Sequence, residues 1–446
     1  MKRLKRYLTG SGLGATLVRA ATGSMGLQIA GMGLGFLVGV QLARGVGVEG
    51  YGVYSFGMSV AAILGIPTEF GLPQLVTREV SMASVHKNWA HMRGVMIFST
   101  SVVAISALIV ALLGELILWA TPLVSDPEQR ATLQWGLLLV PLAGQTKLCG
   151  VAMQGLGRVV LGQLPIYVLR PGFFALSLFF AAYWFAPHLR PSTAMGLQIV
   201  GTALALVTAT TLLARIVPQS ACTATAEYHA KAWLASAFPM ALTDCLRVLQ
   251  SHMVVLLLGL LSNSEQIGLF RVADSTSAML GFPITMLSAI TISVIPRLWA
   301  AHETSKLRRL LWATAIAMTV GVAVLTAPVL IAGRELLGLL FGGAFADAYS
   351  TLLISCSANF AIAASGACGI LLNMTGHEKR VTRAFAFSGT ANVLISSACI
   401  PFWGASGAAM GNAAAAAVWS LMLWQDARRL TNLDTSIFAV SQMKAS

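Results

Sequence analysis

The sequence predicts an all-α integral membrane protein with about twelve transmembrane helices, in two six-helix halves related by an axis along the membrane normal. Three observations carry this prediction: an apolar composition, apolar segments long enough to cross a bilayer, and a repeat half a chain apart. Of the 446 residues, 57% are hydrophobic and only 10% are charged. A soluble fold of this size cannot bury so large an apolar share.

Apolar segments follow one another along the whole chain, and about 20 helical residues suffice to cross ~30 Å of hydrocarbon. Their hydrophobicity is continuous, whereas the strands of a membrane β-barrel would alternate in short runs. Several contain glycine or proline, which packed transmembrane helices tolerate. The predicted spans are residues 20–43, 51–76, 94–119, 132–155, 161–186, 193–216, 232–261, 266–296, 310–332, 347–373, 383–402 and 404–424.

The segment Glu49–Pro67 returns half a chain later as Glu265–Pro283. A period this long does not fit a solenoid and is typical of a duplicated membrane transporter. Because each half has an even number of spans, the second copy enters the membrane in the same orientation as the first. The identical pairs are Glu49/Glu265, Gly52/Gly268, Ser59/Ser275, Ala62/Ala278, Leu64/Leu280, Gly65/Gly281 and Pro67/Pro283.

The positive charges orient the chain in the membrane. Of the 29 Lys and Arg residues, 21 lie in the N-terminus, the tail and the alternate loops on their side, and the opposite loops hold Arg44, Arg130, Arg190 and Arg334. This bias predicts that both termini are cytoplasmic. The net charge of +13 is therefore mainly a topology signal, and no nucleic-acid partner is expected.

These boundaries give a predicted domain organisation. It consists of a basic cytoplasmic N-terminus (1–19), an N-terminal half (20–217), a cytoplasmic linker (218–231), a C-terminal half (232–425) and a cytoplasmic tail (426–446). The six cysteines lie in or beside spans without CxxC spacing, so they predict neither a disulfide nor a metal site. No cofactor is expected. No Gly-Lys-Ser/Thr phosphate loop is present, so direct coupling to ATP is not expected either.

Short motifs point to a family. Leu42-Ala43-Arg44, Gly47, Tyr51-Gly52-Val53-Tyr54, Gly71-Leu72 and Arg78-Glu79 follow one another in Leu42–Val80. In this order and spacing they resemble the start of the bacterial polysaccharide flippases, the Wzx-type branch of the multidrug/oligosaccharidyl-lipid/polysaccharide exporter superfamily. The segment Leu371–Ala384 is similar to that family's loop after the tenth span. The resemblance extends over the whole chain.

The resemblance implies two six-helix bundles around a lumen that opens alternately to each side of the bacterial inner membrane. It implies a cargo of oligosaccharide on undecaprenyl pyrophosphate, moved from the cytoplasmic to the periplasmic leaflet for O-antigen, capsule or exopolysaccharide assembly. The expected partners are this polyprenyl-pyrophosphate-linked glycan, membrane lipids and a polysaccharide polymerase complex.

Ionisable residues inside transmembrane spans are costly and usually mark a transport pathway. Arg170 follows Gln163 and Tyr167, which predicts one polar stripe on the fifth helix. Cations facing a lumen suit a pyrophosphate, because a guanidinium forms bidentate hydrogen bonds and keeps its charge. We therefore expect substrate contacts at Arg170, Arg247, Lys147 and Arg271, and ion coupling at Asp244, Asp274 and Glu69.

Structural roles compete with these functional ones. Asp244 with Arg247, and Arg271 with Asp274, have the i,i+3 spacing of pairs that simply neutralise each other. Glu69 lies near the cytoplasmic end of its span and could reach water. Pro67 and Pro283 predict kinks that serve either alternating access or packing.

Three other function classes compete with the flippase. A cation-coupled multidrug or small-molecule exporter of the same superfamily would share the twelve spans, but we expect an acid-dominated lumen there. The seven charged residues singled out above are instead four cations and three acids. An enzyme would need an acid–base or metal cluster on a wide aqueous face, and the outward loops are short. A channel fits the repeat and the buried charges less well than alternating access does.

Overall fold

The computed structural model describes residues 13–121, 124, 126–185, 189–301 and 303–438. The first part of the predicted basic N-terminus (1–12) and the end of the predicted tail (439–446) lie outside the described residues.

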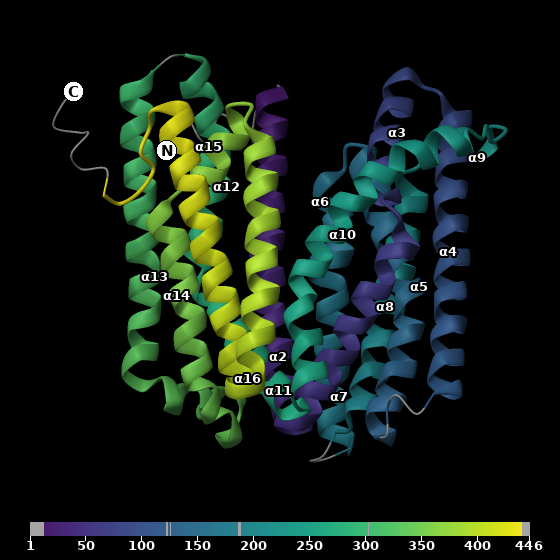
Figure 1. The fold of residues 1–446 in the computed structure, drawn as a ribbon. Helices are drawn as coiled ribbons and strands as arrows, with labels where there is room; N and C mark the ends of the chain where they lie inside the picture. The colour runs from purple at the N-terminus through teal and green to yellow at the C-terminus, as the bar shows by residue number, and fades with distance from the viewer. Residues whose placement is uncertain (1–12, 122–123, 125, 186–188, 302, 439–446) are drawn as a thin grey trace. The chain divides into compact units, whose positions relative to one another are not determined.

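All regular elements of the described part are helical, as Figure 1 shows. The α-helices are α2 (Leu13–Glu69), α3 (Leu72–His86), α4 (Trp89–Ala120), α5 (Pro127–Gly155), α6 (Val159–Leu164), α7 (Arg170–Phe185), α8 (Pro191–Ile216), α9 (Gln219–Thr223), α10 (Ala230–Leu261), α11 (Ser264–Leu280), α12 (Phe282–Ala300), α13 (Thr304–Phe341), α14 (Tyr349–Ser365), α15 (Cys368–Met374) and α16 (Glu378–Thr431). A π-helix, η1 (Pro165–Leu169), joins α6 to α7, and a 3₁₀ helix, η2 (Gly343–Ala348), precedes α14.

Ten helices of the described chain are long and apolar enough to cross a membrane. Two of them contain a break at a glycine with positive φ: α2 at Gly47 (φ 72°) and α16 at Gly404 (φ 52°). Glycine adopts this conformation without the steric cost that a Cβ brings. Each of the two broken helices therefore corresponds to two predicted spans, and the ten helices account for all twelve. The predicted fold class is confirmed.

Some predicted spans are not single helices. The span predicted at 266–296 consists of α11 and α12, which separate at Gly281 just before Pro283. The span predicted at 347–373 consists of α14 and α15, and Gly366 between them has a φ of 72°. A methyl group on Gly366 would lie 2.3 Å from the carbonyl oxygen of Thr435. Hydropathy does not detect such breaks because the side chains on both sides remain apolar.

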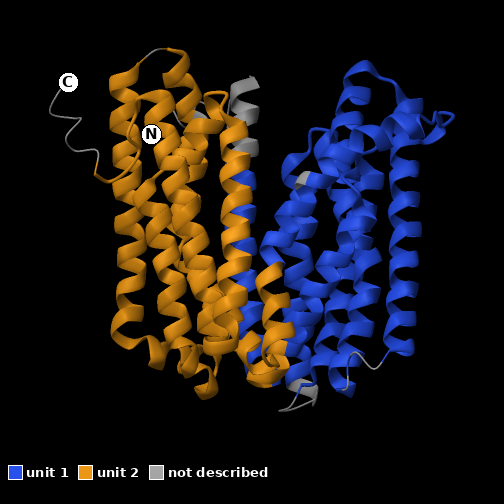
Figure 2. Ribbon diagram, viewed as in Figure 1, with its two compact units in different colours: residues 1–46, 53–252 blue, residues 47–52, 253–446 orange. Residues whose placement is uncertain are grey.

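The chain forms two compact units, shown in Figure 2. Unit 1 contains residues up to 46 and 53–252, and unit 2 contains residues 47–52 and 253–446. In unit 1, α3, α4, α5 and α10 enclose an apolar core around Leu75, Met92 and Trp233. In unit 2, Ile295, Leu311 and Leu371 belong to a second core. The predicted linker contains α9 and the first residues of α10, and it lies within unit 1. The predicted domain boundaries stay a prediction.

The two copies of the repeat cross each other at equivalent glycines. A methyl group on Gly52 would lie 1.7 Å from the carbonyl oxygen of Ser264, and one on Gly268 would lie 2.1 Å from that of Val48. Val48 corresponds to Ser264 in the repeat, just as Gly52 corresponds to Gly268. The two close contacts are therefore equivalent under the repeat. The contacts lie within unit 2, which includes residues 47–52.

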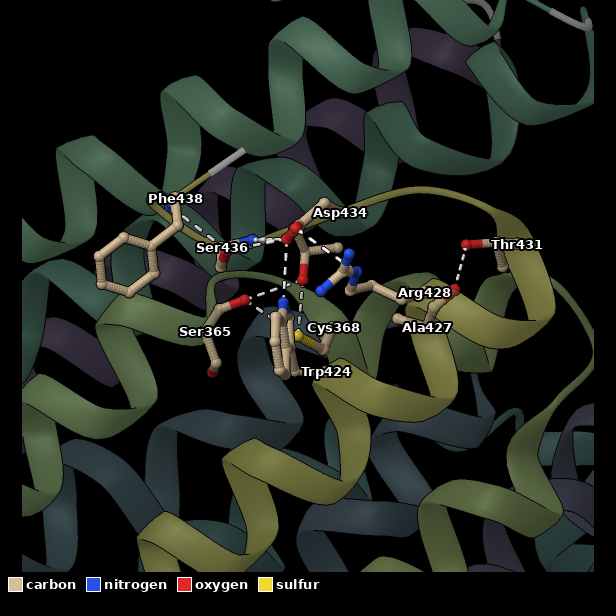
Figure 3. A network of polar contacts seen from close by, with 10 residues as sticks. Ser365, Cys368, Trp424, Ala427, Arg428, Thr431, Asp434, Ser436 and Phe438 are labelled. Atoms are coloured by element: carbon tan, nitrogen blue, oxygen red, sulfur yellow. Dashed lines mark hydrogen bonds and ion pairs between the residues drawn. The ribbon is translucent and has the colours of Figure 1, made fainter. Parts of the chain in front are cut away.

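A hydrogen-bonded segment follows α16 and packs on the end of unit 2 (Figure 3). Asp434 Oδ1 accepts hydrogen bonds from the Trp424 indole (2.9 Å) and from the backbone N–H (3.0 Å) and hydroxyl (2.8 Å) of Ser436. The Thr435 hydroxyl donates to a backbone carbonyl at the end of α14 (2.9 Å). Burial alone would raise the pKa of Asp434, but these hydrogen bonds and Arg428 (3.6 Å) outweigh it and hold the pKa below its ordinary value.

Candidate functional site

A cavity of about 210 Å³ opens inside unit 1 between α2, α5, α7 and α10. Four of the seven ionisable residues predicted to mark a pathway line it: Glu69, Lys147, Arg170 and Asp244. The remaining wall is built mainly from small and aliphatic side chains of α2 and α5. Four charges from four separate helices therefore share one largely apolar space, where their mutual interactions are stronger than in water.

Glu69 and Lys147 form an ion pair across this cavity. The Lys147 ammonium donates a hydrogen bond to Oε2 of Glu69, and the two side chains are 28% and 22% exposed. Glu69 is the last residue of α2, which ends there because Phe70 and Gly71 both have positive φ. A methyl group on Gly71 would lie 2.4 Å from the carbonyl oxygen of Ala237, so this turn sits directly against α10. The helix end thus places the carboxylate opposite α5.

Arg170 is the first residue of α7 and directly follows the π-helix Pro165–Leu169. A π-helix adds a residue to the turn and so re-aims the side chains that follow. The π-helix lies between Gln163 and Arg170, and the polar stripe that the sequence predicts for Gln163, Tyr167 and Arg170 stays a prediction. Gln163 accepts a hydrogen bond from Ser24 (2.5 Å), and the Tyr167 backbone packs against Gly31 of α2.

The surroundings of Arg170 differ from those of Lys147. Arg170 lines the cavity, yet none of the ion pairs found among the described residues involves it. The carboxylate of Glu69 lies close enough to interact with its charge but is hydrogen-bonded to Lys147. Arg170 is therefore the cation that the described part of the cavity wall leaves available for an anionic ligand.

The α10 wall carries Asp244, Val248 and His252 at spacings of four residues, one above the other. Arg247 is not among the lining residues. Its guanidinium is 64% exposed and donates a hydrogen bond to Asp244 Oδ1 at 3.2 Å, so the predicted i,i+3 pair does form.

Sequence reasoning missed His252, whose Nδ1 lies 3.2 Å from the Ser59 hydroxyl. The sequence did contain a signal for His252, because it is a titratable residue inside an apolar span, two helical turns from Asp244.

The other predicted residues lie away from this cavity. Arg271 and Asp274 belong to α11 in unit 2, with their charged groups 3.9 Å apart and their side chains 26% and 44% exposed. Pro283 is the second residue of α12, next to the break at Gly281. Pro67 lies inside α2, which continues to Glu69. The roles predicted for these four residues stay predictions.

Comparisons with known proteins place the fold. The chain is similar to an inward-facing multidrug resistance MATE family transporter of the MOP superfamily, with 12% identity and a TM-score of 0.71, over 96% of this chain and 99% of that one. It is similar to the lipid II flippase MurJ in an inward closed conformation, with 10% identity and a TM-score of 0.66, over 92% and 87%. An outward-facing MATE family transporter gives 13% identity and a TM-score of 0.60, over 97% of each chain.

Sequence comparisons give the family. No significant match is found among curated proteins. A family model described as polysaccharide biosynthesis protein matches residues 17–302, which is more than half of the chain. This match and the structural similarities confirm the resemblance recognised in Leu42–Val80. The protein is thus a multi-pass membrane protein that shares the fold of these MATE and MurJ structures, and the chain belongs to the polysaccharide biosynthesis protein family.

Proposed function

We propose that the protein is an alternating-access flippase that moves undecaprenyl-pyrophosphate-linked oligosaccharide from the cytoplasmic to the periplasmic leaflet of the bacterial inner membrane. This step would supply O-antigen, capsule or exopolysaccharide assembly. Family membership supports a role in polysaccharide biosynthesis, and the similarity to MurJ supports a fold compatible with lipid-linked cargo. Both termini would lie in the cytoplasm, and a polysaccharide polymerase complex would receive the product.

The observation that carries the proposal is the position of Arg170. Arg170 lines a cavity whose wall is built mainly from small and aliphatic residues, and its guanidinium would bind a pyrophosphate there by two parallel hydrogen bonds as well as by charge. The apolar wall would strengthen this attraction because it excludes water.

Lys147 is a second cation on the cavity wall, and its charge is already paired with a carboxylate. Its ammonium donates a hydrogen bond to Glu69. An entering pyrophosphate would compete for the ammonium and release the Glu69 carboxylate. A released carboxylate in this space would then take up a proton or a sodium ion, which links substrate binding to ion coupling. Asp244 is the second candidate for this coupling in unit 1, and Asp274 is the candidate in unit 2.

The cavity volume helps to discriminate between cargoes. Pockets that enclose drug-sized molecules measure about 300–1,000 Å³, whereas this cavity measures about 210 Å³. It therefore suits the charged head of a larger ligand, whose lipid and glycan extend elsewhere, better than a complete drug molecule.

A cation-coupled multidrug exporter is the second candidate function. The observation that favours it is the pair of carboxylates, Glu69 and Asp244, on the wall of the same cavity. A cationic drug would be attracted to these carboxylates and repelled by Arg170, so the two functions predict opposite effects of removing this arginine.

The test uses Arg170→Ala and Arg170→Lys in cells that depend on this gene for surface polysaccharide. We expect Arg170→Ala to abolish surface glycan and to leave lipid-linked oligosaccharide accumulated in the inner leaflet, at near-normal protein abundance. Arg170→Lys should restore only part of the export, because an ammonium keeps the charge but lacks the guanidinium fork. The matched control is Arg190→Ala, which removes a 77% exposed cation from a loop. Normal glycan export by Arg170→Ala at normal abundance would contradict the proposal, and increased drug resistance would favour the exporter.

Asp244 and Arg247 provide a second comparison. If their pair is only structural, each single alanine variant should lower abundance and the double variant should restore both abundance and transport. If Arg247 contacts the pyrophosphate, the double variant should regain abundance without regaining export. Restored export would remove Arg247 from the substrate site.

A further inference from the structure

A cluster of metal-ligating side chains lies outside the cavity, at the start of α4. His91 is on the first turn of α4, and Glu227 and His229 lie in the segment before α10, which we call the connecting segment (residues 224–229). One ligand atom from each of the three residues lies within 4.8 Å of the other two. We propose that these three residues bind a divalent transition-metal ion of the zinc class.

The ligand set selects the class of ion. Two imidazoles and a carboxylate match the donors that zinc uses when three protein ligands leave its fourth position to water. Imidazole nitrogen also suits nickel and copper, whereas magnesium and calcium prefer oxygen ligands throughout. His91 and His229 already lie with their ring centroids 5.6 Å apart, so the two side chains need only small rotations to share an ion.

The backbone holds the connecting segment against α4 independently of any metal. The N–H of Glu227 donates to the carbonyl of Ala90 (3.2 Å), and the guanidinium of Arg93 donates to the carbonyl of Ala224 (2.6 Å). Gly94 allows this approach, because a methyl group there would lie 1.8 Å from the carbonyl oxygen of Glu227. The two elements that supply the ligands are therefore already in place before an ion binds.

A neighbouring carboxylate orients one of the imidazoles. His91 Nε2 lies 3.0 Å from Glu79 Oε2, and the other oxygen of Glu79 accepts hydrogen bonds from Arg78. Metal-bound histidines commonly have such a carboxylate on their second nitrogen, where it fixes the ring and strengthens the ligand. Trp233 borders the cluster, with its ring centroid 5.4 Å from that of His91 and 5.9 Å from that of His229.

The proposed site is separate from the transport cavity, since His91, Glu227 and His229 are not among the residues that line it. His229 and Glu227 are about half exposed, so an ion can enter from solvent. A bound ion would link the connecting segment to the start of α4 and restrict the chain between α9 and α10. Zinc binding and glycan transport can therefore be tested independently.

The test titrates the purified full-length chain with zinc chloride by calorimetry, after treatment with a chelator. We expect one ion per chain for the wild type and loss of this binding in the double variant His91→Ala/His229→Ala. Glu79→Gln should weaken binding by about 10–100-fold, because it removes a carboxylate that orients a ligand. His377→Ala is the control and should bind zinc as the wild type does. Equal zinc binding by the double variant and the wild type, or no binding by the wild type, would overturn the proposal.

Limited proteolysis provides an independent readout. Lys231, the second residue of α10, is exposed next to the connecting segment, so trypsin should cleave there more slowly when zinc is bound. Gly94→Ala keeps every ligand but would push the connecting segment away from α4, so it should lose both zinc binding and the zinc-dependent protection. Zinc-dependent protection that persists in His91→Ala/His229→Ala would contradict the assignment.

Discussion

Gly52→Ala would place a methyl group where the two copies of the repeat cross. The new Cβ would lie 1.7 Å from the carbonyl oxygen and 2.6 Å from the carbonyl carbon of Ser264. Real Cβ atoms essentially never approach a heavy atom more closely than 3.0 Å, so the two helices would have to separate by about 1.3 Å. The equivalent Gly268→Ala, at 2.1 Å from the carbonyl oxygen of Val48, would require about 0.9 Å.

The obstacle in both variants is a backbone carbonyl, which cannot rotate away as a flexible side chain can. Overpacking typically costs about 1–3 kcal/mol, and a rigid obstacle places these variants at the upper end. We expect both to have a lower melting temperature in detergent and a lower abundance in the membrane, with the larger effect at Gly52.

Gly35→Ala is the matched control, because a methyl group there meets nothing within 4 Å. Since alanine favours helix over glycine by about 1 kcal/mol, this control should be neutral or slightly stabilising. The double variant Gly52→Ala/Gly268→Ala should cost less than the sum of its parts, because one helix separation relieves both clashes. A Gly52→Ala protein as stable as Gly35→Ala would refute the close crossing.

Three further predictions follow from the charges. Removing either Lys147 or Glu69 leaves the other charge uncompensated, which costs up to about 3–5 kcal/mol when the charge is fully buried. Each single alanine variant should therefore be less abundant in the membrane than the double variant. Equal abundance of all three variants would contradict the ion pair. Asp434 has a lowered pKa, so its contribution to stability is complete above its ordinary value of 3.8 and is lost as the pH falls through the lower folded value. Asp434→Asn should therefore lower the melting temperature at pH 7, and the difference from wild type should shrink toward pH 3; a constant difference would argue against this titration. Reporter fusions after Arg93 should report cytoplasm and those after Asp126 the periplasm, and the reverse result would overturn the orientation.

The charges inside the spans could be found from sequence, but their partners could not. Glu69, Lys147, Arg170 and Asp244 stand out because each interrupts an apolar segment, which is a property of the local sequence. That Lys147 pairs with Glu69 depends on how α5 packs against the end of α2, and these residues are 78 positions apart. The i,i+3 pair of Asp244 and Arg247 was predictable, because one turn of helix fixes that distance.

The sequence by itself determined the number of spans, because a long apolar segment must satisfy its backbone hydrogen bonds within the bilayer and does so as a helix. It also determined the internal repeat, which can be read from identical residues at equivalent positions. It also marked Gly52 and Gly268 as equivalent. Only the tertiary structure decided that these glycines lie where the helices cross, that Arg170 lines the cavity, and that His91 lies next to His229. These features depend on contacts between residues far apart in the chain, which side-chain packing fixes and which hydropathy and local spacing do not encode.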